Sequence, residues 1–328
     1  MTHRHRPCNP DDETASMTAP AILVHDLTKS YGPVQAVNRI SFEVAAGELV
    51  GFLGNNGAGK TTTMRILTTF MPATSGYAAV AGYDVMYQSM DVRRHLGYLP
   101  ESVPLYPEMR VDEYLVCRAK LKQVDRTRRT AVVDSCLDKC RIKEVRRRLI
   151  GSLSKGYRQR VGLADALLSD PPVLIMDEPL SGLDPVQQEE TLATIRALGG
   201  QHTVLFSSHH LPDVEKVCDR VLIIHRGRIR FDDKMSSIAA RAPTVVAEVR
   251  ADAEAGTEVF RHLKGVTDAA AVGSHDGWTE FEIKAAAHAD PREAVATAVA
   301  GKGWGLRRLE LRREKLADTY MRVSFERN

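Results

Sequence analysis

One glycine-rich segment has the composition and spacing of a phosphate-binding loop. It fits the pattern G-x-x-x-x-G-K-[ST], with an apolar run before it and helix-favouring sequence after it. Its glycines would let backbone N–H groups turn toward phosphate oxygens, and the positive end of the following helix would face the same anion. A glycine-rich turn that matched by chance would lack these flanks. The segment comprises Gly54, Asn55, Asn56, Gly57, Ala58, Gly59, Lys60 and Thr61.

Three side chains at the end of this segment have separate expected roles. Lys60 would bridge the β- and γ-phosphates of a nucleotide as a point charge. The Thr61 hydroxyl would bind Mg²⁺, and Thr62 would reach another phosphate oxygen. The segment therefore predicts a site for a nucleoside triphosphate and Mg²⁺.

A pair of acidic residues could complete such a site. Asp177 and Glu178 directly follow the apolar run Val173–Met176, so both would lie at the end of a buried strand. Asp177 is the candidate Mg²⁺ ligand, and Glu178 could take a proton from the attacking water. A strand that simply leads into a solvated turn would show the same two residues, so the pair gains its meaning from the phosphate-binding segment.

The elements that would position these residues are those of an α/β domain. From Ile22 to Phe231 short apolar runs alternate with helical patterns, which is typical of a largely parallel sheet covered by helices. Charged, helix-favouring sequence from residue 91 to about 150 predicts a helical insert in this domain. The predicted strands are Glu48–Leu53, Val173–Met176, Thr203–Ser207 and Arg220–His225, and the predicted insert helices are Val111–Lys122 and Arg128–Lys139.

The sequence after residue 240 has a different pattern. Its predicted elements follow the order βαββαβ, which is the ferredoxin-like arrangement of a small α+β domain. A closing amphipathic segment, Lys315–Phe325, places Leu316, Tyr320 and Val323 along one face. The predicted strands are Thr244–Arg250, Val266–Val272, Trp278–Lys284 and Gly305–Leu311, and the predicted helices are Ala253–Leu263 and Pro291–Ala300.

Three regions follow from these patterns. Residues 1–20 lack an apolar signal-peptide core and predict a disordered leader, in which Met17 is an alternative start. Residues 21–240 form the α/β domain, and residues 241–328 form the accessory α+β domain.

Composition excludes several classes of protein. The 328 residues carry 45 basic and 42 acidic side chains, and this net charge of +3 is too balanced for a nucleic-acid-coating surface or a polybasic membrane anchor. The five scattered cysteines favour a reducing cytosol. The long uncharged stretch Ile66–Tyr83 contains Pro72 and Gly76, so it cannot serve as a spanning helix. We expect a soluble chain without a nucleic-acid partner.

A segment upstream of Asp177 indicates a family. Leu153-Ser154-Lys155-Gly156-Tyr157-Arg158-Gln159-Arg160 resembles the LSGGQ signature of ABC ATPases. In isolation, Ser154 is equally well explained as an ordinary helix N-cap. Other segments match the family in its order. Lys29-Ser30-Tyr31-Gly32 resembles the A-loop, Leu96-Gly97-Tyr98-Leu99-Pro100-Glu101 the Q-loop, Ser181-Gly182-Leu183-Asp184 the D-loop, and Ser207-Ser208-His209 the surroundings of the switch histidine.

The resemblance implies a P-loop NTPase core with a helical insert, acting as an ATP hydrolase. Two copies, expected to form a homodimer, would close head to tail around ATP and Mg²⁺, each nucleotide lying between the phosphate-binding segment of one copy and the signature of the other. Glu178 and His209 would control hydrolysis, and Tyr31 would stack on adenine. The residues assigned to the contact between copies are Ser154, Lys155, Gly156 and Asp184.

Some positions depart from the family pattern. Glu101 stands where a glutamine is expected; its carboxylate could bind Mg²⁺ or its water, or it could be a loop glutamate in solvent. Asn55 replaces the common proline, and Leu180 a typical threonine. Lys155 and Tyr157 alter the signature, and Lys155 brings a Cβ to a position where glycine is usual. None of these changes removes a catalytic group.

The form of the signature and the C-terminal extension resemble ABC-2-type and multidrug exporters, including the gliding-motility branch. This implies a separately encoded membrane permease and a place on the cytoplasmic face of the inner membrane. Residues 104–107 and Val111–Leu115 offer apolar contacts for it, although about half of them would pack inside the insert. The alternatives are a non-transport ABC ATPase of translation or repair, a catalytically silent regulatory module, and an importer ATPase.

Overall fold

The computed structural model describes residues 19–239, 243–286, 289–313 and 315–325. The predicted leader, including Met17, lies outside these ranges apart from its last two residues, as do residues 240–242 at the predicted domain boundary. Within the described ranges, no helix is long and apolar enough to cross a membrane.

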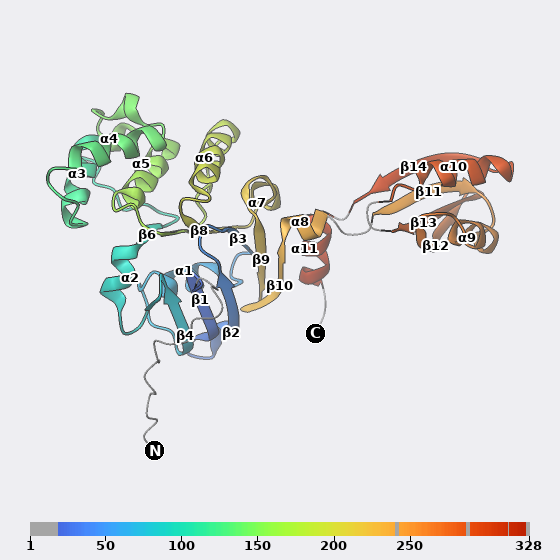
Figure 1. The fold of residues 1–328 in the computed structure, drawn as a ribbon, viewed down its shortest axis with the longest axis horizontal. Helices are drawn as coiled ribbons and strands as arrows, with labels where there is room; N and C mark the ends of the chain where they lie inside the picture. The colour runs from blue at the N-terminus through green and yellow to red at the C-terminus, as the bar shows by residue number, and fades with distance from the viewer. Residues whose placement is uncertain (1–18, 240–242, 287–288, 314, 326–328) are drawn as a thin grey trace, which may run out of the picture.

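A six-stranded sheet forms the centre of the α/β domain (Figure 1). Its strand order is β10-β9-β3-β8-β7-β6, and every neighbouring pair is parallel except the edge pair β9–β10. The strands are β3 (Leu49–Leu53), β6 (Leu96–Leu99), β7 (Val173–Met176), β8 (Thr203–Ser208), β9 (Arg220–His225) and β10 (Arg228–Lys234). The four strands predicted in this region are confirmed to within one residue.

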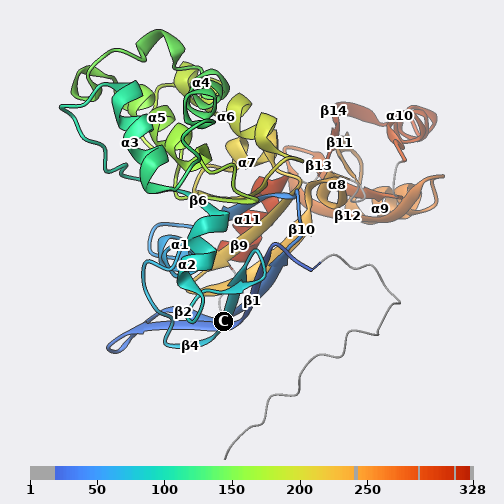
Figure 2. The same cartoon turned by 60° about the vertical axis from the view of Figure 1, so that its left-hand side comes forward.

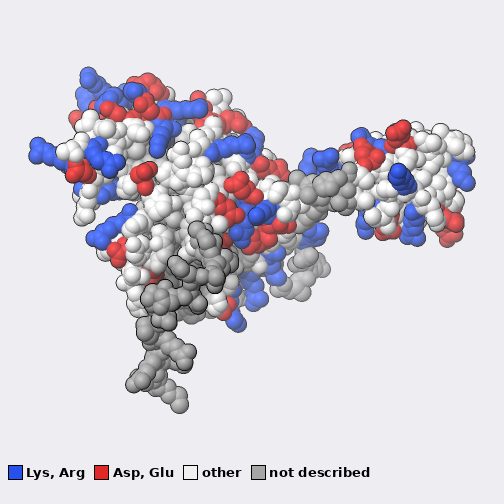
Figure 3. Space-filling view, viewed as in Figure 1, with Lys and Arg blue, Asp and Glu red and all other residues white. Residues whose placement is uncertain are grey.

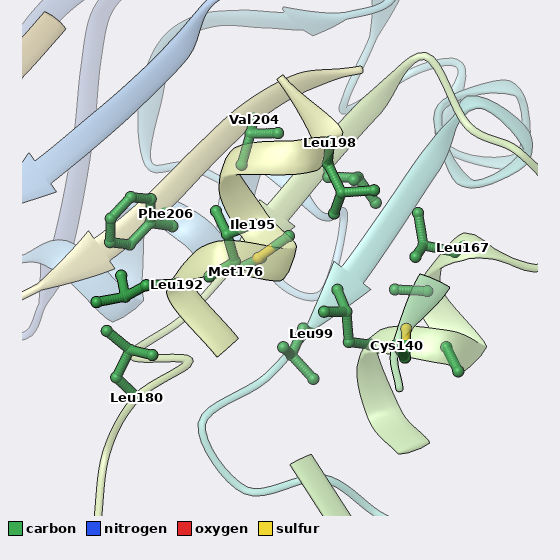
Figure 4. Close-up of a cluster of buried hydrophobic side chains, with 14 of the residues drawn as sticks. Leu99, Cys140, Leu167, Met176, Leu180, Leu192, Ile195, Leu198, Val204 and Phe206 are labelled. Carbon is green, nitrogen blue, oxygen red and sulfur yellow. The ribbon is translucent and has the colours of Figure 1, made fainter. Parts of the chain in front are cut away.

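The central strands β3, β7 and β8 are buried at every position. Since successive side chains of a strand point to opposite sides, these strands are covered on both faces. Val204 and Phe206 belong to a cluster that includes residues of the covering helices, whereas Leu205 belongs to a second cluster on the other face. Strands buried on both faces read as continuous apolar runs, which made these strands recognisable in the sequence. Figure 4 shows part of the first cluster, including Leu99, Cys140, Leu167, Met176, Leu180, Leu192, Ile195, Leu198, Val204 and Phe206.

The second face is covered by a smaller antiparallel sheet and by α1 (Lys60–Leu67). The smaller sheet has the order β2-β1-β4-β5. Its strands are β1 (Ile22–Tyr31), β2 (Val34–Val44), β4 (Ser75–Val80) and β5 (Tyr83–Asp84). The two sheets therefore enclose the helix that starts at the phosphate-binding segment.

The helical insert differs in extent from its prediction at residues 91 to about 150. Residues 89–95 form α2 (Ser89–His95), which packs on β4 and β5, and β6 pairs with β7, so residues 91–99 belong to the core. The insert helices α3 (Val111–Leu121) and α4 (Arg129–Lys139) pack on α5 (Lys155–Leu167). The prediction was wrong at its start because a four-residue strand adjoins the charged α2, and the helical layer also continues past residue 150.

Three further helices and two 3₁₀ turns complete the α/β domain. The helices are α6 (Pro185–Leu198), α7 (Leu211–Val217) and α8 (Met235–Ala239), and the turns are Lys143–Val145 and Ile150–Ser152. In Figure 1, α6 and α7 lie on the same side of the sheet as the insert.

The C-terminal domain has the predicted βαββαβ order. Its sheet order, β12-β13-β11-β14, is antiparallel throughout, and Phe260 and Phe281 meet edge to face in its core. Its elements are β11 (Thr244–Arg250), α9 (Ala253–Arg261), β12 (Val266–His275), β13 (Trp278–Ala285), α10 (Arg292–Gly301) and β14 (Gly305–Arg312). Figure 1 shows this domain apart from the core, and Figure 3 shows acidic and basic side chains interspersed over both.

The last helix, α11 (Leu316–Phe325), returns to the α/β domain. It packs against α7 and β9, and Leu316 and Val323 join the first hydrophobic cluster of the core. Figure 2 shows α11 beside β9 and β10. The amphipathic face predicted for this segment is therefore used against the α/β domain, and the C-terminal domain is connected to it at both ends.

Candidate nucleotide site

The phosphate-binding segment follows the central strand of the core sheet. β3 is buried along its whole length, and residues 54–59 connect it to the first turn of α1. Gly59 has a φ of 111°, and a Cβ at this position would lie 2.5 Å from the Ala36 carbonyl oxygen, so the position requires glycine. We call residues 54–61 the phosphate loop.

Lys60 lies within this loop and is only 5% exposed. Its Nζ donates a hydrogen bond of 2.7 Å to the Gly54 carbonyl oxygen and lies 3.2 Å from Glu178 Oε1. The N-terminus of α1 contributes a partial positive charge at the same place. The loop thus presents a fixed cation and a helix N-terminus, which is the combination that binds phosphate.

Asp177 lies opposite Thr61. The Thr61 hydroxyl donates to Asp177 Oδ1 at 3.3 Å, and the Ser207 hydroxyl donates to the same oxygen at 2.7 Å. Ser207 also accepts the backbone N–H of Glu178 at 2.9 Å. One buried hydroxyl therefore positions both acidic residues.

Glu178 is held between two cationic or proton-carrying groups. Its Oε1 faces Lys60, and its Oε2 lies 2.8 Å from His209 Nδ1. Its backbone has a φ of 47°, a left-handed conformation that costs energy in a residue with a Cβ and is often found at functional sites. The structure thus brings together the two residues that the sequence assigns to catalysis.

A cavity of about 350 Å³ joins these residues. Glu101 is among its lining residues, so the substituted Q-loop residue faces the same space as Lys60 and Glu178. Gly54 and Ala58 are not in its lining, although Gly54 bonds to Lys60. The lining residues are Ala36, Asn55, Asn56, Gly57, Gly59, Lys60, Thr61, Thr62, Glu101, Glu178, Ser181 and His209.

Three residues of this site were not assigned from the sequence as site residues. Ala36 and Ser181 line the cavity, and Ser207 supports both acidic residues. Ser207 had a recognisable signal, because it stands two residues before His209 in the segment that resembles the switch region. Ala36 had none, since it reaches the loop only through strand β2.

Tyr31 does not line the cavity. It lies at the end of β1, the residue is 47% exposed, and its hydroxyl is 3.1 Å from Met71 Sδ. Lys29 Nζ lies over the ring, 5.4 Å from its centre, and adenine stacking on Tyr31 stays a prediction.

The signature segment, Leu153–Arg160, is separate from the cavity of its own chain. Ser154 is the N-cap of α5 and accepts the Tyr157 N–H at 3.4 Å, as the ordinary capping explanation expects. A Cβ on Gly156 would lie 2.2 Å from Gln187 Oε1, so a larger residue there would displace the Gln187 side chain of α6. Asp184 caps α6 and accepts the Gln187 N–H at 2.9 Å.

Lys155, the unusual residue of this segment, lies beside the D-loop of its own chain. A Cβ on Gly182 would lie 2.4 Å from Lys155 Nζ. Lys155 also lines a second cavity, of about 600 Å³, together with Glu101 and Arg158. In this structure the ammonium is directed to these groups and away from the phosphate loop of the same chain.

The donor set around Asp177 fits Mg²⁺. Mg²⁺ prefers oxygen ligands, and it usually keeps several waters and phosphate oxygens beside one or two protein ligands. Thr61 and Asp177 offer two such oxygens at 3.3 Å from each other, and Glu101 faces the same cavity. Behind them, burial raises the pKa of Tyr98 to about 12, with the charge of Asp177 adding to the effect, so this phenol stays neutral near pH 7.

Comparison with known proteins decides the family. A family model described as ABC transporter matches residues 37–181. The uncharacterized ABC transporter ATP-binding protein YxlF of Bacillus subtilis (strain 168) is 34% identical over 304 residues, which cover 92% of this chain and 99% of that relative. The chain belongs to the ABC transporter ATP-binding proteins. The fold and the ATPase activity that the signature segment implied are thereby confirmed.

Two further comparisons support the assignment of this chain to the ABC transporter ATP-binding proteins. The daunorubicin resistance ATP-binding protein DrrA3 of Streptomyces coeruleorubidus is 34% identical over 214 residues, which cover 65% of this chain and 68% of that relative. A solved ATP-binding subunit of an ABC transporter superposes with a TM-score of 0.60 and 30% identity, over 66% of this chain and 91% of that one.

Replacing Glu101 with glutamine tests the departure in the Q-loop of this ABC protein. If the carboxylate helps to hold Mg²⁺, Glu101→Gln is expected to raise the Mg²⁺ concentration for half-maximal ATPase activity about threefold to tenfold, because a neutral amide binds the ion less strongly. The measurement is a Mg²⁺ titration at fixed ATP. An unchanged midpoint would show that Glu101 is a solvated loop residue.

Proposed function

We propose that this protein is the ATP-driven subunit of an ABC-2-type exporter, working as a head-to-tail dimer on a separate membrane permease. The observation that carries the proposal is the cavity that joins Lys60, Thr61, Glu178 and His209, while Ser154 of the same chain lies elsewhere. Each chain has the phosphate loop and the catalytic residues on one side of the expected ATP site. A second copy would supply the signature segment on the other side.

Glu178 is positioned to act as the general base. Its carboxylate is buried, faces the cavity and is fixed by Lys60 on one oxygen and by His209 on the other. A carboxylate so placed can accept a proton from water as that water attacks the γ-phosphate of ATP. His209, which is half exposed, can contact the γ-phosphate and also hold Glu178 in its orientation.

The phosphate loop would bind the triphosphate through its backbone N–H groups and Lys60, with Thr61 and Asp177 binding Mg²⁺. When bound, Mg²⁺ supplies positive charge that offsets the charge on the phosphates. Ser207 contributes by keeping Asp177 and Glu178 in fixed positions. Tyr31 would contact the adenine from the end of β1.

The second copy would contribute its signature segment. Ser154 stands at the N-terminus of α5, where unpaired N–H groups and the helix dipole favour a phosphate. Gly156 would allow close approach, and Lys155 and Asp184 would lie at the same contact between copies. ATP then favours the closed dimer because both chains bind it, and hydrolysis removes that link.

Export is supported by the relative whose name refers to daunorubicin resistance and by the C-terminal domain. The ferredoxin-like βαββαβ order differs from the small barrel expected on importer ATPases. We place the protein at the cytoplasmic face of the inner membrane, where its permease would hold it.

A groove between the core and the insert is the proposed docking site for a cytoplasmic helix of the permease. It has a volume of about 480 Å³ and is lined by Phe70, Tyr98, Pro104 and Tyr114. Phe70 is 71% exposed, an unusual state for a large apolar side chain. We call this site the docking groove.

The residues that line the docking groove differ in part from those that the sequence predicted to contact the permease. Val111 and Leu115 are fully buried inside the insert, as was expected for about half of the residues in these segments, so they do not contribute to a permease contact. Pro104 and Tyr114 come from the segments predicted to contact the permease, whereas Phe70, which was not predicted, comes from the segment after α1. Tyr114 and Arg118 of the insert both donate hydrogen bonds to Asp165, and these bonds fix the wall of the groove that the insert forms.

Replacing Phe70 with alanine is expected to weaken the complex with the permease about tenfold, because an exposed aromatic side chain that fills a groove is a typical hot spot. The measurement is recovery of the permease with a tagged chain from gently solubilised membranes. ATP hydrolysis by the isolated chain should stay unchanged, since Phe70 does not line the nucleotide cavity.

The matched control is Tyr87→Ala, because Tyr87 is 90% exposed and lies outside the groove. Equal recovery with Phe70→Ala and the wild type would reject the docking groove. Recovery of only soluble partners, such as ribosomes, with the wild-type chain would reject the transport function itself.

A further inference from the structure

The C-terminal helix touches the phosphate loop. The Tyr320 hydroxyl of α11 donates a hydrogen bond of 2.7 Å to Asn55 Oδ1. Asn55 lines the nucleotide cavity and stands where the family commonly has proline. A residue far along the chain, beyond the C-terminal domain, therefore contacts the loop that binds phosphate.

The position of Tyr320 is fixed by the packing of its helix. Leu316 is 1% exposed and its N–H donates to Glu215 Oε1 at 3.2 Å, so a carboxylate of α7 caps the start of α11. Thr319 is fully buried and Val323 is 8% exposed. The loss of the Tyr320 hydroxyl would leave these contacts in place.

Asn55 closes the first turn of the phosphate loop. Its carbonyl oxygen accepts the Ala58 N–H at 3.1 Å and lies 3.4 Å from Lys60 Nζ. Its side chain is the part that reaches Tyr320. A bond to this side chain restrains the backbone to which both inner contacts are made. The ring of a proline would fix the backbone dihedral φ at this position. Asparagine leaves φ free, so its backbone loses more conformational entropy when the loop becomes ordered.

We propose that Tyr320 is a positioning residue for nucleotide binding, which holds Asn55 and keeps the phosphate loop in its binding conformation. A loop that is already ordered loses less conformational entropy when the nucleotide binds, so the bond increases affinity. Because the loop binds the phosphates that ATP and ADP share, Tyr320 strengthens the binding of both. The base Glu178 is held by Lys60 and His209, whereas the Tyr320 hydroxyl bonds to Asn55, so the rate of the chemical step is not expected to depend on this bond. This inference rests on the role of the phosphate loop proposed above.

Replacing Tyr320 with phenylalanine in the full chain removes the hydroxyl and keeps the ring. The expected result is an increase of about threefold to tenfold in the KM for ATP and in the Kd for a fluorescent ADP analogue, with kcat within twofold of the wild type. The melting temperature without nucleotide should stay close to that of the wild type. Tyr87→Phe, at an exposed tyrosine, controls for the loss of a hydroxyl elsewhere.

A double-mutant cycle with Asn55→Ala assigns the effect to the bond. If Tyr320 acts through Asn55, Tyr320→Phe should have little further effect on nucleotide affinity in the Asn55→Ala background. Additive effects, an unchanged KM, or a joint fall in kcat and melting temperature would each overturn the proposal. Lys60→Ala separates the two hypotheses: if it abolishes ATP binding while Tyr320→Phe has no effect, the phosphate loop stands and only the role of Tyr320 is rejected.

Discussion

A Glu178→Gln variant is expected to bind ATP but to hydrolyse it at least about a hundredfold more slowly than the wild-type chain. The amide has the shape of the carboxylate and can still lie between Lys60 and His209, but it cannot accept a proton from water. ATP would therefore persist in the site. The measurements are phosphate release at saturating ATP and Mg²⁺, and gel filtration with ATP, in which a stable dimer should accumulate.

The matched control is Glu293→Gln, which makes the same change at an exposed glutamate of α10. Its turnover should equal that of the wild type. Near-normal turnover in Glu178→Gln would reject this residue as the base. Slow turnover without a dimer would keep the base and reject the head-to-tail arrangement.

A Lys60→Ala variant is expected to weaken ATP binding by at least about thirtyfold. The ammonium is the only side-chain cation among the residues that line the nucleotide cavity, apart from any charge on His209, and a charge-assisted bond to phosphate is stronger than a neutral one. The substitution also leaves Glu178 without its cationic neighbour, which adds repulsion toward the γ-phosphate. The measurement is equilibrium binding of a fluorescent ATP analogue.

Lys264→Ala, at an exposed lysine of the C-terminal domain, is the control and should bind ATP as the wild type does. The melting temperature without nucleotide should be compared in both variants, so that a loss of folded protein is not read as a loss of affinity. Wild-type affinity in a folded Lys60→Ala variant would reject the phosphate loop as the nucleotide site.

Residues that share a short motif with a strand or helix could be placed from the sequence. Lys60 and Thr61 follow β3 at fixed spacing, and Asp177 and Glu178 end the apolar run of β7. Because parallel strands deliver their carboxyl ends to one edge of a sheet, the two segments had to meet there. Their meeting at 3.2 Å between Lys60 and Glu178 confirms that expectation.

Contacts between segments with no shared motif could not be predicted. Ser207 lies in a run that resembles the switch region, but its bonds to both acidic residues depend on the register of β7 with β8. Phe70 is one apolar residue among several after α1, and only the fold shows that it lines the same groove as Pro104. Tyr320 was placed on an apolar face, but the partner of that face was not evident.

The return of α11 to the core affects how the protein is made. A chain leaving the ribosome folds its first domain while later residues are still being added. Here Leu316, Tyr320 and Val323, which complete the α/β domain, are added only after all of the C-terminal domain. The phosphate loop therefore gains its contact with Tyr320 only after the whole C-terminal domain has been translated, and a chain terminated before α11 would have a nucleotide site without that support.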